Sequence, residues 1–332
     1  MDMELDFFLK EADLTLDEWD ASKCEWGNLL SIYNDFVRIQ PSLVAAAKMI
    51  SSRIQQFDRV HSVRWRIKSP IGLLKKIVRK NLEEKPKDKW VGINKDNYVS
   101  VVTDLIGVRA LHLFKDDCVE VDQAIRDVWE LAEEVVVYIR DGDKTPSEIQ
   151  DRGGIVKVHD DGYRSIHYIV RIQPEKTTYY PEIQVRTIFQ EGWSEIDHTI
   201  RYPDFSDNEQ IAVFLRLFSG LAGSADEMGL YAKELSAELK KAETEKRRIV
   251  AELEQAIMQR DKAMHDIEST LQEMEDLKLK DEKSQVLISR LKSDVHTLQN
   301  AQERFRKKEA LDKFTKGNLF GSRVYGASRL SG

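Results

Sequence analysis

The chain has 332 residues and a formal net charge of −7, with 33% charged and 41% hydrophobic residues. This balance argues against a generic nucleic-acid binder, which presents a strongly basic surface. No apolar run approaches the roughly 20 residues that a membrane-spanning helix needs, so no membrane partner is expected. Cys24 and Cys118 lie far apart without zinc-type neighbours, and the first residues lack the basic and apolar regions of a signal peptide. The sequence therefore predicts a soluble, cytoplasmic protein with reduced thiols.

The chain begins with an acidic segment and continues into helix patterns. Residues 1–25 are acidic and weakly periodic, which predicts a short helix or a mobile lead-in. Residues 26–57 carry apolar side chains at helical spacing. Proline removes a backbone donor and clashes with the preceding turn, so Pro41 is expected to divide this segment into two helices.

The middle of the chain alternates between strand and helix patterns. Residues 59–68 predict a first strand, and Ser69 as N-cap followed by Pro70 predicts the start of a helix. Further strands are expected at residues 104–114, 134–140, 163–172 and 180–187, and helices at residues 71–81, 119–133, 188–201 and 207–228. Residues 141–160 are rich in Gly, Asp and Lys and predict a long loop. This order predicts a mixed sheet with flanking helices, an α+β or α/β arrangement.

The composition changes at about residue 229, where a polar heptad pattern begins. A first apolar stripe falls on a and d positions, interrupted by Arg260: Val250, Leu253, Ile257, Met264, Ile267, Leu271 and Met274. A second, offset stripe follows the polar residues 278–285, which predicts a stutter: Ile288, Leu291, Val295, Leu298 and Phe305. We expect a coiled coil over residues 229–312 that holds a homo-oligomer, a dimer in the simplest case, and a flexible tail over residues 313–332. A helix that folds back on the preceding domain, or one reserved for another protein, stays an alternative.

Three of the predicted strands carry polar side chains on one face. Alternate side chains of a strand share a face, which groups Arg66 with Lys68, Tyr163 with Ser165 and His167, and Glu182 with Gln184 and Arg186. The first group supplies two cations, the second an aromatic ring with a hydroxyl and an imidazole, and the third a carboxylate between polar neighbours. Together these groups provide what a metal-nucleotide site needs.

These motifs resemble the synthetase domain of the RelA/SpoT-type alarmone (ppGpp) synthetases, especially the small single-domain members. Four segments carry the resemblance, in the order of the family: the metal-aspartate strand at residues 104–109, the guanosine-binding loop at 161–167, the second acidic strand at 182–187, and a closing helix at 193–198 followed by Tyr202. The resemblance covers roughly residues 26–223. It implies a nucleotidyltransferase-like α+β domain over residues 26–228, with a mostly antiparallel five-stranded sheet. The family's companion hydrolase domain is not expected, because only residues 1–57 precede the first strand and they contain no histidine.

The resemblance also implies roles on the ATP side of the site. Asp104 and Glu182 would hold Mg²⁺, which prefers hard oxygen ligands; plain surface carboxylates are the alternative. Arg66, Lys68 and Lys76 would bind the ATP phosphates, where fixed cations offset developing charge. Arg109 would stack on adenine, although pairing with an acid explains a strand arginine nearly as well.

The acceptor side departs from the family pattern. Tyr163 would stack on the acceptor base, with Ser165, His167, Gln184 and Arg186 beside it. The family commonly has asparagine where this chain has Asp161, and His159 stands where a lysine is usual. Lys157 and Arg152 are the nearby cations that could take over the role of that lysine. A family serine is replaced by Gly72. These departures leave the acceptor open.

The leading hypothesis is a Mg²⁺-dependent pyrophosphokinase that transfers the β,γ-pyrophosphate of ATP to the 3′-hydroxyl of GDP or GTP, giving (p)ppGpp. A first alternative is a toxin-like member that modifies the 3′ end of tRNA or an adenine nucleotide. A second alternative, of another class, is a degenerate synthetase fold that serves as a nucleotide sensor or scaffold. The presence of both carboxylates and both strand cations argues against the second alternative.

Overall fold

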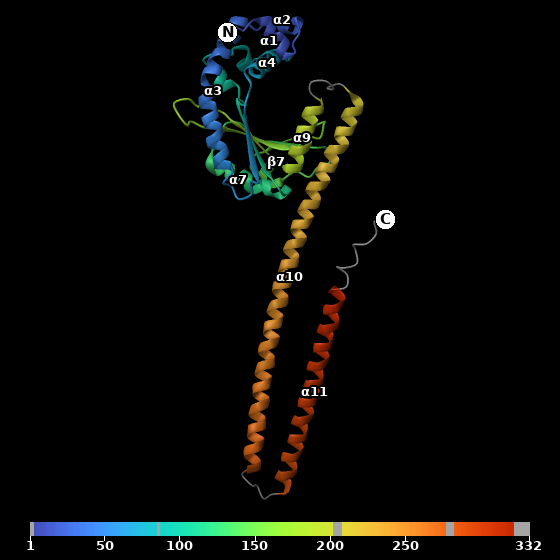
Figure 1. Ribbon diagram of the computed structural model, residues 1–332. Coiled ribbons are helices and arrows are strands. Elements are labelled where there is room, and N and C mark those ends of the chain that lie inside the picture. Colours follow the sequence, from blue (N-terminus) through green and yellow to red (C-terminus); the bar gives the residue numbers. More distant parts are fainter. Residues whose placement is uncertain (1–2, 85–86, 202–207, 277–281, 322–332) are drawn as a thin grey trace. The chain divides into compact units, whose positions relative to one another are not determined.

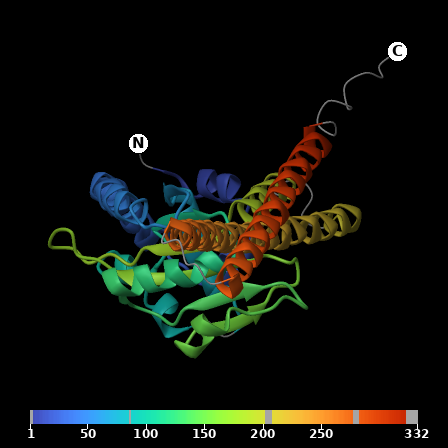
Figure 2. The same cartoon turned by 90° about the horizontal axis from the view of Figure 1, so that it is seen from below.

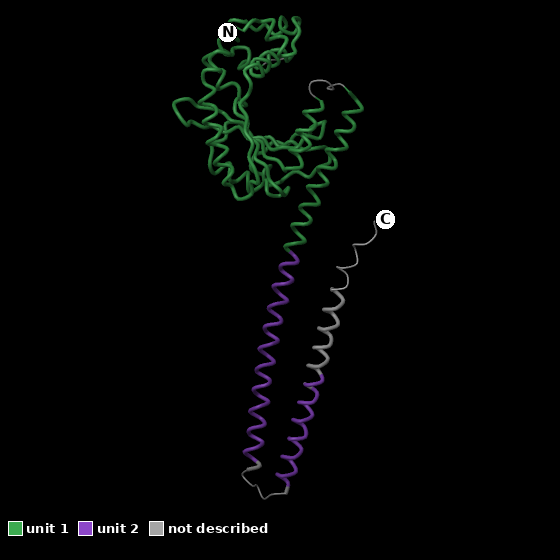
Figure 3. The backbone as a smooth tube through the Cα atoms, viewed as in Figure 1, with its two compact units in different colours: residues 1–237 green, residues 238–332 purple. Residues whose placement is uncertain are grey.

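The computed structural model describes residues 3–84, 87–201, 208–276 and 282–321 (Figure 1). It contains two compact units, Met1–Ala237 and Glu238–Gly332, which are described separately (Figure 3). Among the described residues, no helix is both long and apolar enough to cross a membrane.

Unit 1 is built on a seven-stranded mixed sheet with the strand order β1-β2-β7-β6-β4-β5, and β3 pairs with β6. The strands are β1 (Ser62–Ile67), β2 (Ile106–His112), β3 (Glu130–Leu131), β4 (Val136–Ile139), β5 (Ile155–Val158), β6 (Ser165–Arg171) and β7 (Glu182–Thr187). The pairs β2–β7 and β4–β5 are parallel, and the other pairs are antiparallel. The predicted α+β class and mostly antiparallel sheet are confirmed, but β3 and β5 enlarge the expected five strands to seven.

Helices pack around this sheet. Those that precede α10 (Glu209–Asp276) in unit 1 are α1 (Leu5–Ala12), α2 (Leu16–Ser22), α3 (Trp26–Ile54), α4 (Pro70–Asn81), α5 (Asp88–Val91), α6 (Tyr98–Val101), α7 (Cys118–Val128), α8 (Ser147–Asp151) and α9 (Ile188–Arg201). α3 and α7 lie on its apolar face. α3 contacts β1 and β2, and α7 contacts β7. Inward-facing side chains such as Val108, Ile183 and Tyr168 are fully buried there. The polar side chains therefore lie on the opposite face.

Of the two expectations for residues 1–25, a short helix or a mobile lead-in, the described residues 3–25 show helix. Helices α1 and α2 lie against α4 (Figures 1 and 2). Phe8 is fully buried and stacks on Trp26 with ring centroids 5.6 Å apart, while Trp19 meets Trp26 edge to face. Helices this short give little periodicity. The readable signal was the capping box of Thr15 and Glu18, which opens α2.

Pro41 does not divide the following segment, so that prediction was wrong. α3 is one helix of 29 residues with Pro41 inside it. Phe36 before the proline and Leu43 after it are both fully buried. Tertiary packing on both sides therefore holds the helix together across the missing backbone hydrogen bond.

Two further boundaries differ from the expectation. The helix predicted over residues 119–133 ends at Val128, and β3 follows. The loop predicted over residues 141–160 contains α8 and β5. β5 has only four residues and lies at the edge of the sheet, where Ile155 and Val158 are exposed. Such a short, exposed strand lacks the apolar alternation that marks a half-buried one.

Other predictions are confirmed. The Gly72 N–H donates to the Ser69 hydroxyl at 3.0 Å, so Ser69 caps α4 as expected. The helix predicted over residues 188–201 has the bounds of α9.

The predicted helix over residues 207–228 is the start of a much longer one. α10 (Glu209–Asp276) has 68 residues and runs through unit 1 into unit 2, where α11 (Glu282–Gly321) follows. Within unit 2, Gln299 contacts Glu268, and Leu271 and Ile288 are buried. Helix extends into the segment expected to be flexible from residue 313. Residues 278–281 of the predicted stutter, residues 322–332 of the tail and the Phe305 side chain lie outside the described residues.

We expect the full chain to form a homo-oligomer through unit 2. Val250, Leu253 and Ile267 of the predicted stripe are exposed, and an exposed apolar stripe of this length is an association surface. Truncation after Ala237 should therefore lower the mass seen by light scattering to that of a monomer, while all proposed site residues are retained. This end point keeps Lys233, which binds Asp116 and Asp117 at 2.8–2.9 Å.

Two outcomes would contradict this oligomer. A full chain that is monomeric at micromolar concentration would leave the stripe to another protein. A truncated chain that stays oligomeric would place the interface on the first part of α10, where Phe214, Leu217 and Leu221 are exposed.

Candidate active site

The strand register gathers the predicted site residues on one face of the sheet. Arg109 of β2 lies opposite Gln184 of β7, which lies opposite His167 of β6. The next row joins Arg66 of β1, Gly107 of β2 and Glu182 of β7. A Cβ at Gly107 would meet the Arg66 side chain at 3.5 Å, an ordinary van der Waals contact, so the two positions are direct neighbours. The three polar faces predicted from alternation therefore form one surface.

Asp104 and two lysines form the first centre of this surface. Asp104 lies two residues before β2 and Lys68 immediately follows β1. The backbone bond from Lys68 N to Leu105 O (3.0 Å) holds the two segments side by side. Lys68 Nζ lies 2.7 Å from Asp104 Oδ2, and Lys76 Nζ of α4 lies 2.8 Å from Oδ1. Burial raises the pKa of Asp104, but the two ammonium groups outweigh it and leave that pKa below its usual value. Asp104 is therefore an ionised carboxylate.

Glu182 forms the second centre. His167 Nδ1 lies 3.2 Å from Glu182 Oε1, and the Gln184 amide donates to Oε2 at 2.7 Å. Because a carboxylate only accepts, Nδ1 carries the proton and Nε2 accepts from the Tyr163 hydroxyl at 3.0 Å, a tautomer assigned from these partners. Burial raises the pKa of Glu182, but the hydrogen bond from His167 helps to bring it below its usual value. Glu182 is also ionised.

The two carboxylates fit a hard divalent cation that is completed by substrate phosphates. The negative charge of Asp104 acts on the pKa of Glu182, so the two centres are electrostatically coupled. Asp104 Oδ1 is buried without a hydrogen-bond donor, because the Lys76 contact is an ion pair without hydrogen-bond geometry. Within the described part of the chain, no group of three or more His, Cys, Asp or Glu could hold a metal. Mg²⁺ commonly uses one or two carboxylates plus phosphate oxygens, which this donor set matches.

Helix α9 brings two acids to the arginines of β1 and β2. Arg109 Nη1 lies 2.9 Å from Glu191 Oε1 and also bonds Glu195. Arg64 Nη1 lies 3.0 Å from Glu191 and 3.2 Å from Glu195. Of the two interpretations of Arg109, the structure shows the pairing with an acid. Neither Glu191 nor Glu195, which lies within the closing motif 193–198, was assigned a role from the sequence, although their i,i+4 spacing places them on one face of α9.

The Arg186 side chain is buried under the other polar side chains of the site. It is 2% exposed. Its Nε lies 3.0 Å from Glu191 Oε2, and its Nη2 donates to Gln184 Oε1 at 2.8 Å. Its guanidinium carbon lies 5.5 Å from the centroid of the Tyr163 ring. Arg186 therefore supports Tyr163 and Gln184 from below and has little surface for a direct contact with an acceptor.

Four aromatic rings surround the proposed acceptor position. Tyr138 lies 5.8 Å from Tyr163 and 4.9 Å from His167 between ring centroids, and His159 lies 5.5 Å from Tyr163. Burial raises the pKa of Tyr163, so its hydroxyl stays a donor. The sequence analysis missed Tyr138, whose alternation with the buried Val137 in β4 was the available signal. These rings form a surface on which a nucleobase could stack.

The remaining predicted acceptor residues divide between the site and other regions. Ser165 is buried, and its hydroxyl donates to Val185 O at 3.4 Å. Lys157 is exposed on β5, opposite Tyr138 in the register. Arg152 lies elsewhere, because it binds Asp122 of α7 at 2.9 Å, and Asp122 also accepts from Tyr168 on the apolar face. Asp161 binds Arg201 of α9 at 2.7 Å. Tyr202, part of the motif that closes the domain, lies outside the described residues.

Glu182 is expected to stay ionised in mildly acidic solution because His167 stabilises its charged form. Ordinary carboxyl pKa values are about 4, and the folded-state values of Asp104 and Glu182 lie below theirs. Activity at the site should therefore persist to about pH 5. The stability that these depressed pKa values contribute is present above the unfolded-state pKa and is lost as pH falls through the folded-state pKa. In His167→Leu the burial remains and the hydrogen bond is lost, so the acid limb of the pH–rate profile should move to higher pH.

Thermal unfolding is measured at each pH as the control for this profile. It distinguishes activity lost through protonation of a site residue from activity lost through unfolding. A wild-type acid limb with a midpoint above about pH 6 would contradict an ionised Glu182 as the group that sets the limb.

The chain is similar to several known proteins. Residues 65–207 match the family model described as "Region found in RelA / SpoT proteins". GTP pyrophosphokinase YwaC of Bacillus subtilis (strain 168) is 24% identical over 197 residues, which cover 57% of this chain and 82% of that protein. The crystal structure of small alarmone synthetase 1 from Bacillus subtilis is 19% identical with a TM-score of 0.44, covering 62% of this chain and 99% of that one. A GTP pyrophosphokinase family protein from Streptococcus pneumoniae is 20% identical with a TM-score of 0.39, covering 69% and 97%. The family model that matches residues 65–207 is thus the one that the sequence motifs resemble.

Proposed function

We propose that this chain is a Mg²⁺-dependent pyrophosphokinase that transfers the β,γ-pyrophosphate of ATP to the 3′-hydroxyl of GDP or GTP, making (p)ppGpp. One observation carries the proposal: two ionised carboxylate centres share a sheet face, Asp104 between two lysines and Glu182 beside an imidazole and a stacking ring. The likeness to a GTP pyrophosphokinase supports this assignment.

The cations of the first centre would bind the ATP phosphates. Lys68 and Lys76 are paired with Asp104. The phosphates of ATP would attract these two ammonium groups, which would leave the Asp104 carboxylate to hold Mg²⁺. Bound Mg²⁺ would supply charge neutralisation to the phosphates during transfer. Arg66, exposed beside Gly107, adds a third cation on this side.

The second centre would orient the acceptor. Tyr163 stacks on the base, and the Glu182 carboxylate accepts a hydrogen bond from the 3′-hydroxyl and takes its proton. The 3′-oxygen forms a bond to the β-phosphorus, the bond from that phosphorus to the α,β-bridging oxygen breaks, and AMP leaves with the bridging oxygen. His167 holds Glu182 in place through its Nδ1–H throughout.

The acceptor is tested by incubating the full chain with Mg²⁺ and ATP labelled in the β- and γ-phosphates, in parallel with GDP, GTP, ATP and bulk tRNA. We expect the label in the guanine nucleotide. A second candidate has specific support: Asp161, where the family has asparagine, is bound to Arg201 and so presents a different group to the base. Label in tRNA or in the adenine nucleotide, and none in GDP or GTP, would replace the leading acceptor. If none of the four acceptors is labelled, the result would favour a nucleotide sensor or scaffold over an enzyme.

A further inference from the structure

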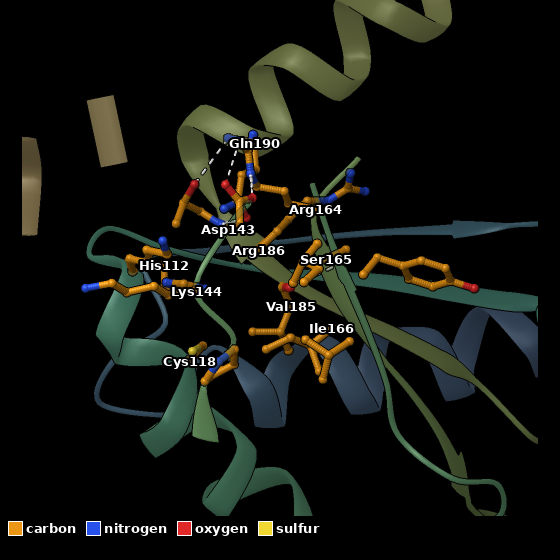
Figure 4. Close-up of a pocket in the computed structure, with 16 residues that line it drawn as sticks. His112, Cys118, Asp143, Lys144, Arg164, Ser165, Ile166, Val185, Arg186 and Gln190 are labelled. Atoms are coloured by element: carbon orange, nitrogen blue, oxygen red, sulfur yellow. Dashed lines mark hydrogen bonds and ion pairs between the residues drawn. The ribbon is translucent and has the colours of Figure 1, made fainter. Parts of the chain in front are cut away.

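Arg164 is buried between the acceptor loop and α10. It lies between Tyr163 and Ser165 in the chain but is 8% exposed. Its Nε lies 2.5 Å from Asp143 Oδ2, and its Nη1 donates to the Ser219 carbonyl at 3.0 Å and to the Ser219 hydroxyl at 3.1 Å. Figure 4 shows Arg164 next to Asp143 at a cavity of about 60 Å³ that Ser165 also lines. One guanidinium thus joins three segments of unit 1.

Ser219 closes the same contact from the side of α10. It is fully buried, and its hydroxyl donates to the Gly162 carbonyl at 2.9 Å, across 57 residues of sequence. Ser219 therefore bonds the residues on both sides of Tyr163, Gly162 through its backbone and Arg164 through its side chain. The ring proposed to stack on the acceptor is held on both sides by one serine.

Two glycines permit this close approach. Gly162 has a φ of +78°, and a Cβ there would lie 2.7 Å from the Ser219 hydroxyl. A Cβ at Gly223, one turn further along α10, would lie 2.7 Å from Arg164 Nη2. A side chain at either position would force the Ser219 hydroxyl or the Arg164 guanidinium to shift out of this contact.

We propose that Arg164 and Ser219 are positioning residues for acceptor binding, and that they make the first part of α10 a structural component of the acceptor site. The name of the ligand rests on the proposed function, whereas the contact itself rests on the geometry of the free protein. Neither residue touches the reacting atoms. They act by fixing the position of the Tyr163 backbone, and with it the position of the ring.

The charge and burial of the contact explain its rigidity. Burial raises the pKa of Asp143, but the Arg164 guanidinium outweighs it, so the carboxylate stays ionised. Asp143 also accepts from the Arg140 backbone N–H at 3.1 Å, which ties the turn after β4 to the same network. Loss of one partner of such a buried pair leaves the other without its counterion.

The proposal predicts a selective effect. Asp104, Lys68 and Lys76 lie at the β1–β2 end of the sheet, whereas Tyr163 and Arg164 immediately precede β6. Loss of the Ser219 hydrogen bonds should therefore weaken acceptor binding and leave ATP binding unchanged. A general loss of stability would weaken the binding of both substrates.

The test compares Ser219→Ala with Ser224→Ala. Arg164→Ala could fail to fold, whereas Ser219→Ala removes only a hydroxyl. Ser224 is the matched control, because its hydroxyl donates to Gly220 O on its own helix at 3.1 Å. We expect Ser219→Ala to raise the acceptor KM about tenfold, with the ATP KM within about twofold, and Ser224→Ala to change neither.

A second measurement needs no substrate, which separates this proposal from the proposed function. The Gly162 N–H donates to His159 O at 2.9 Å, so its hydrogen exchange reports the loop. Exchange over residues 160–165 should be about tenfold faster in Ser219→Ala than in the wild type or in Ser224→Ala. Unchanged exchange, or an equal rise of both KM values, overturns the proposal. Faster exchange in a protein without transferase activity would sustain the contact and overturn only the proposed function.

Discussion

Asp104→Asn or Glu182→Gln should each lower kcat/KM for pyrophosphate transfer by at least about a thousandfold. The structure shows both groups as ionised carboxylates with distinct partners, two lysines for Asp104 and His167 for Glu182. Removal of one charge from a metal and phosphate site costs several kcal/mol of transition-state stabilisation, and each 1.36 kcal/mol is a factor of ten. The measurement is steady-state transfer with saturating Mg²⁺.

The folding of these variants must be measured beside their activity. Asp104 is half-buried between Lys68 and Lys76, so its neutralisation leaves two ammonium groups without their counterion. We expect the free energy of unfolding to fall by about 1–3 kcal/mol, because both lysines can still reach water. Glu130→Gln, an exposed carboxylate on β3 that pairs with Arg171, is the matched control and should retain full activity. Wild-type activity in either site variant would refute the assignment.

Tyr163→Ala should raise the acceptor KM by about tenfold to a hundredfold and leave the ATP KM nearly unchanged. Stacking on a nucleobase is worth roughly 1–3 kcal/mol per base. The ring lies among Tyr138, His159 and His167, at centroid distances of 5.5–5.8 Å from each. Tyr163→Phe separates the two roles of the residue, because it keeps the ring and removes the hydroxyl that donates to His167.

The acceptor identity decides where the loss appears. If the acceptor is tRNA, the KM of tRNA should rise in Tyr163→Ala, and the effect on free GDP should be negligible. An equal rise of the ATP KM and the acceptor KM would show that Tyr163 is a packing residue of the sheet. A normal acceptor KM in Tyr163→Ala would remove the stacking role altogether.

Alternation along a strand predicted the shared polar face because the pleat of a strand is a local property. The residues alone grouped Glu182 with Gln184 within one strand, and the register places this group on the same face as Arg66 and His167. The proximity of Asp104 and Lys76 could not be predicted from alternation, because it depends on how α4 packs after β1. Here the resemblance to a known family supplied the missing information.

Contacts between distant elements lay beyond the sequence pattern. The burial of Arg186 and the pairing of Arg109 with Glu191 depend on where α9 crosses the sheet. Arg152 was an acceptor candidate because the lysine usual in the family is displaced here, whereas α8 and β5 bring Arg152 to Asp122 of α7. The bond from Ser219 to Gly162 requires a packed helix and has no signature in periodicity.

The most direct measurement of the central claim follows each phosphate of ATP separately. The full chain is incubated with Mg²⁺ and ATP labelled in the α- or the γ-phosphate. The acceptor is the one that takes up label in the parallel incubations with GDP, GTP, ATP and tRNA. If the polar face of the sheet transfers pyrophosphate, the γ-label appears in the acceptor product, and the α-label is recovered as AMP in equal amount. Release of the γ-label as inorganic phosphate with ADP as the partner product, or an α-label in the acceptor, would contradict the account.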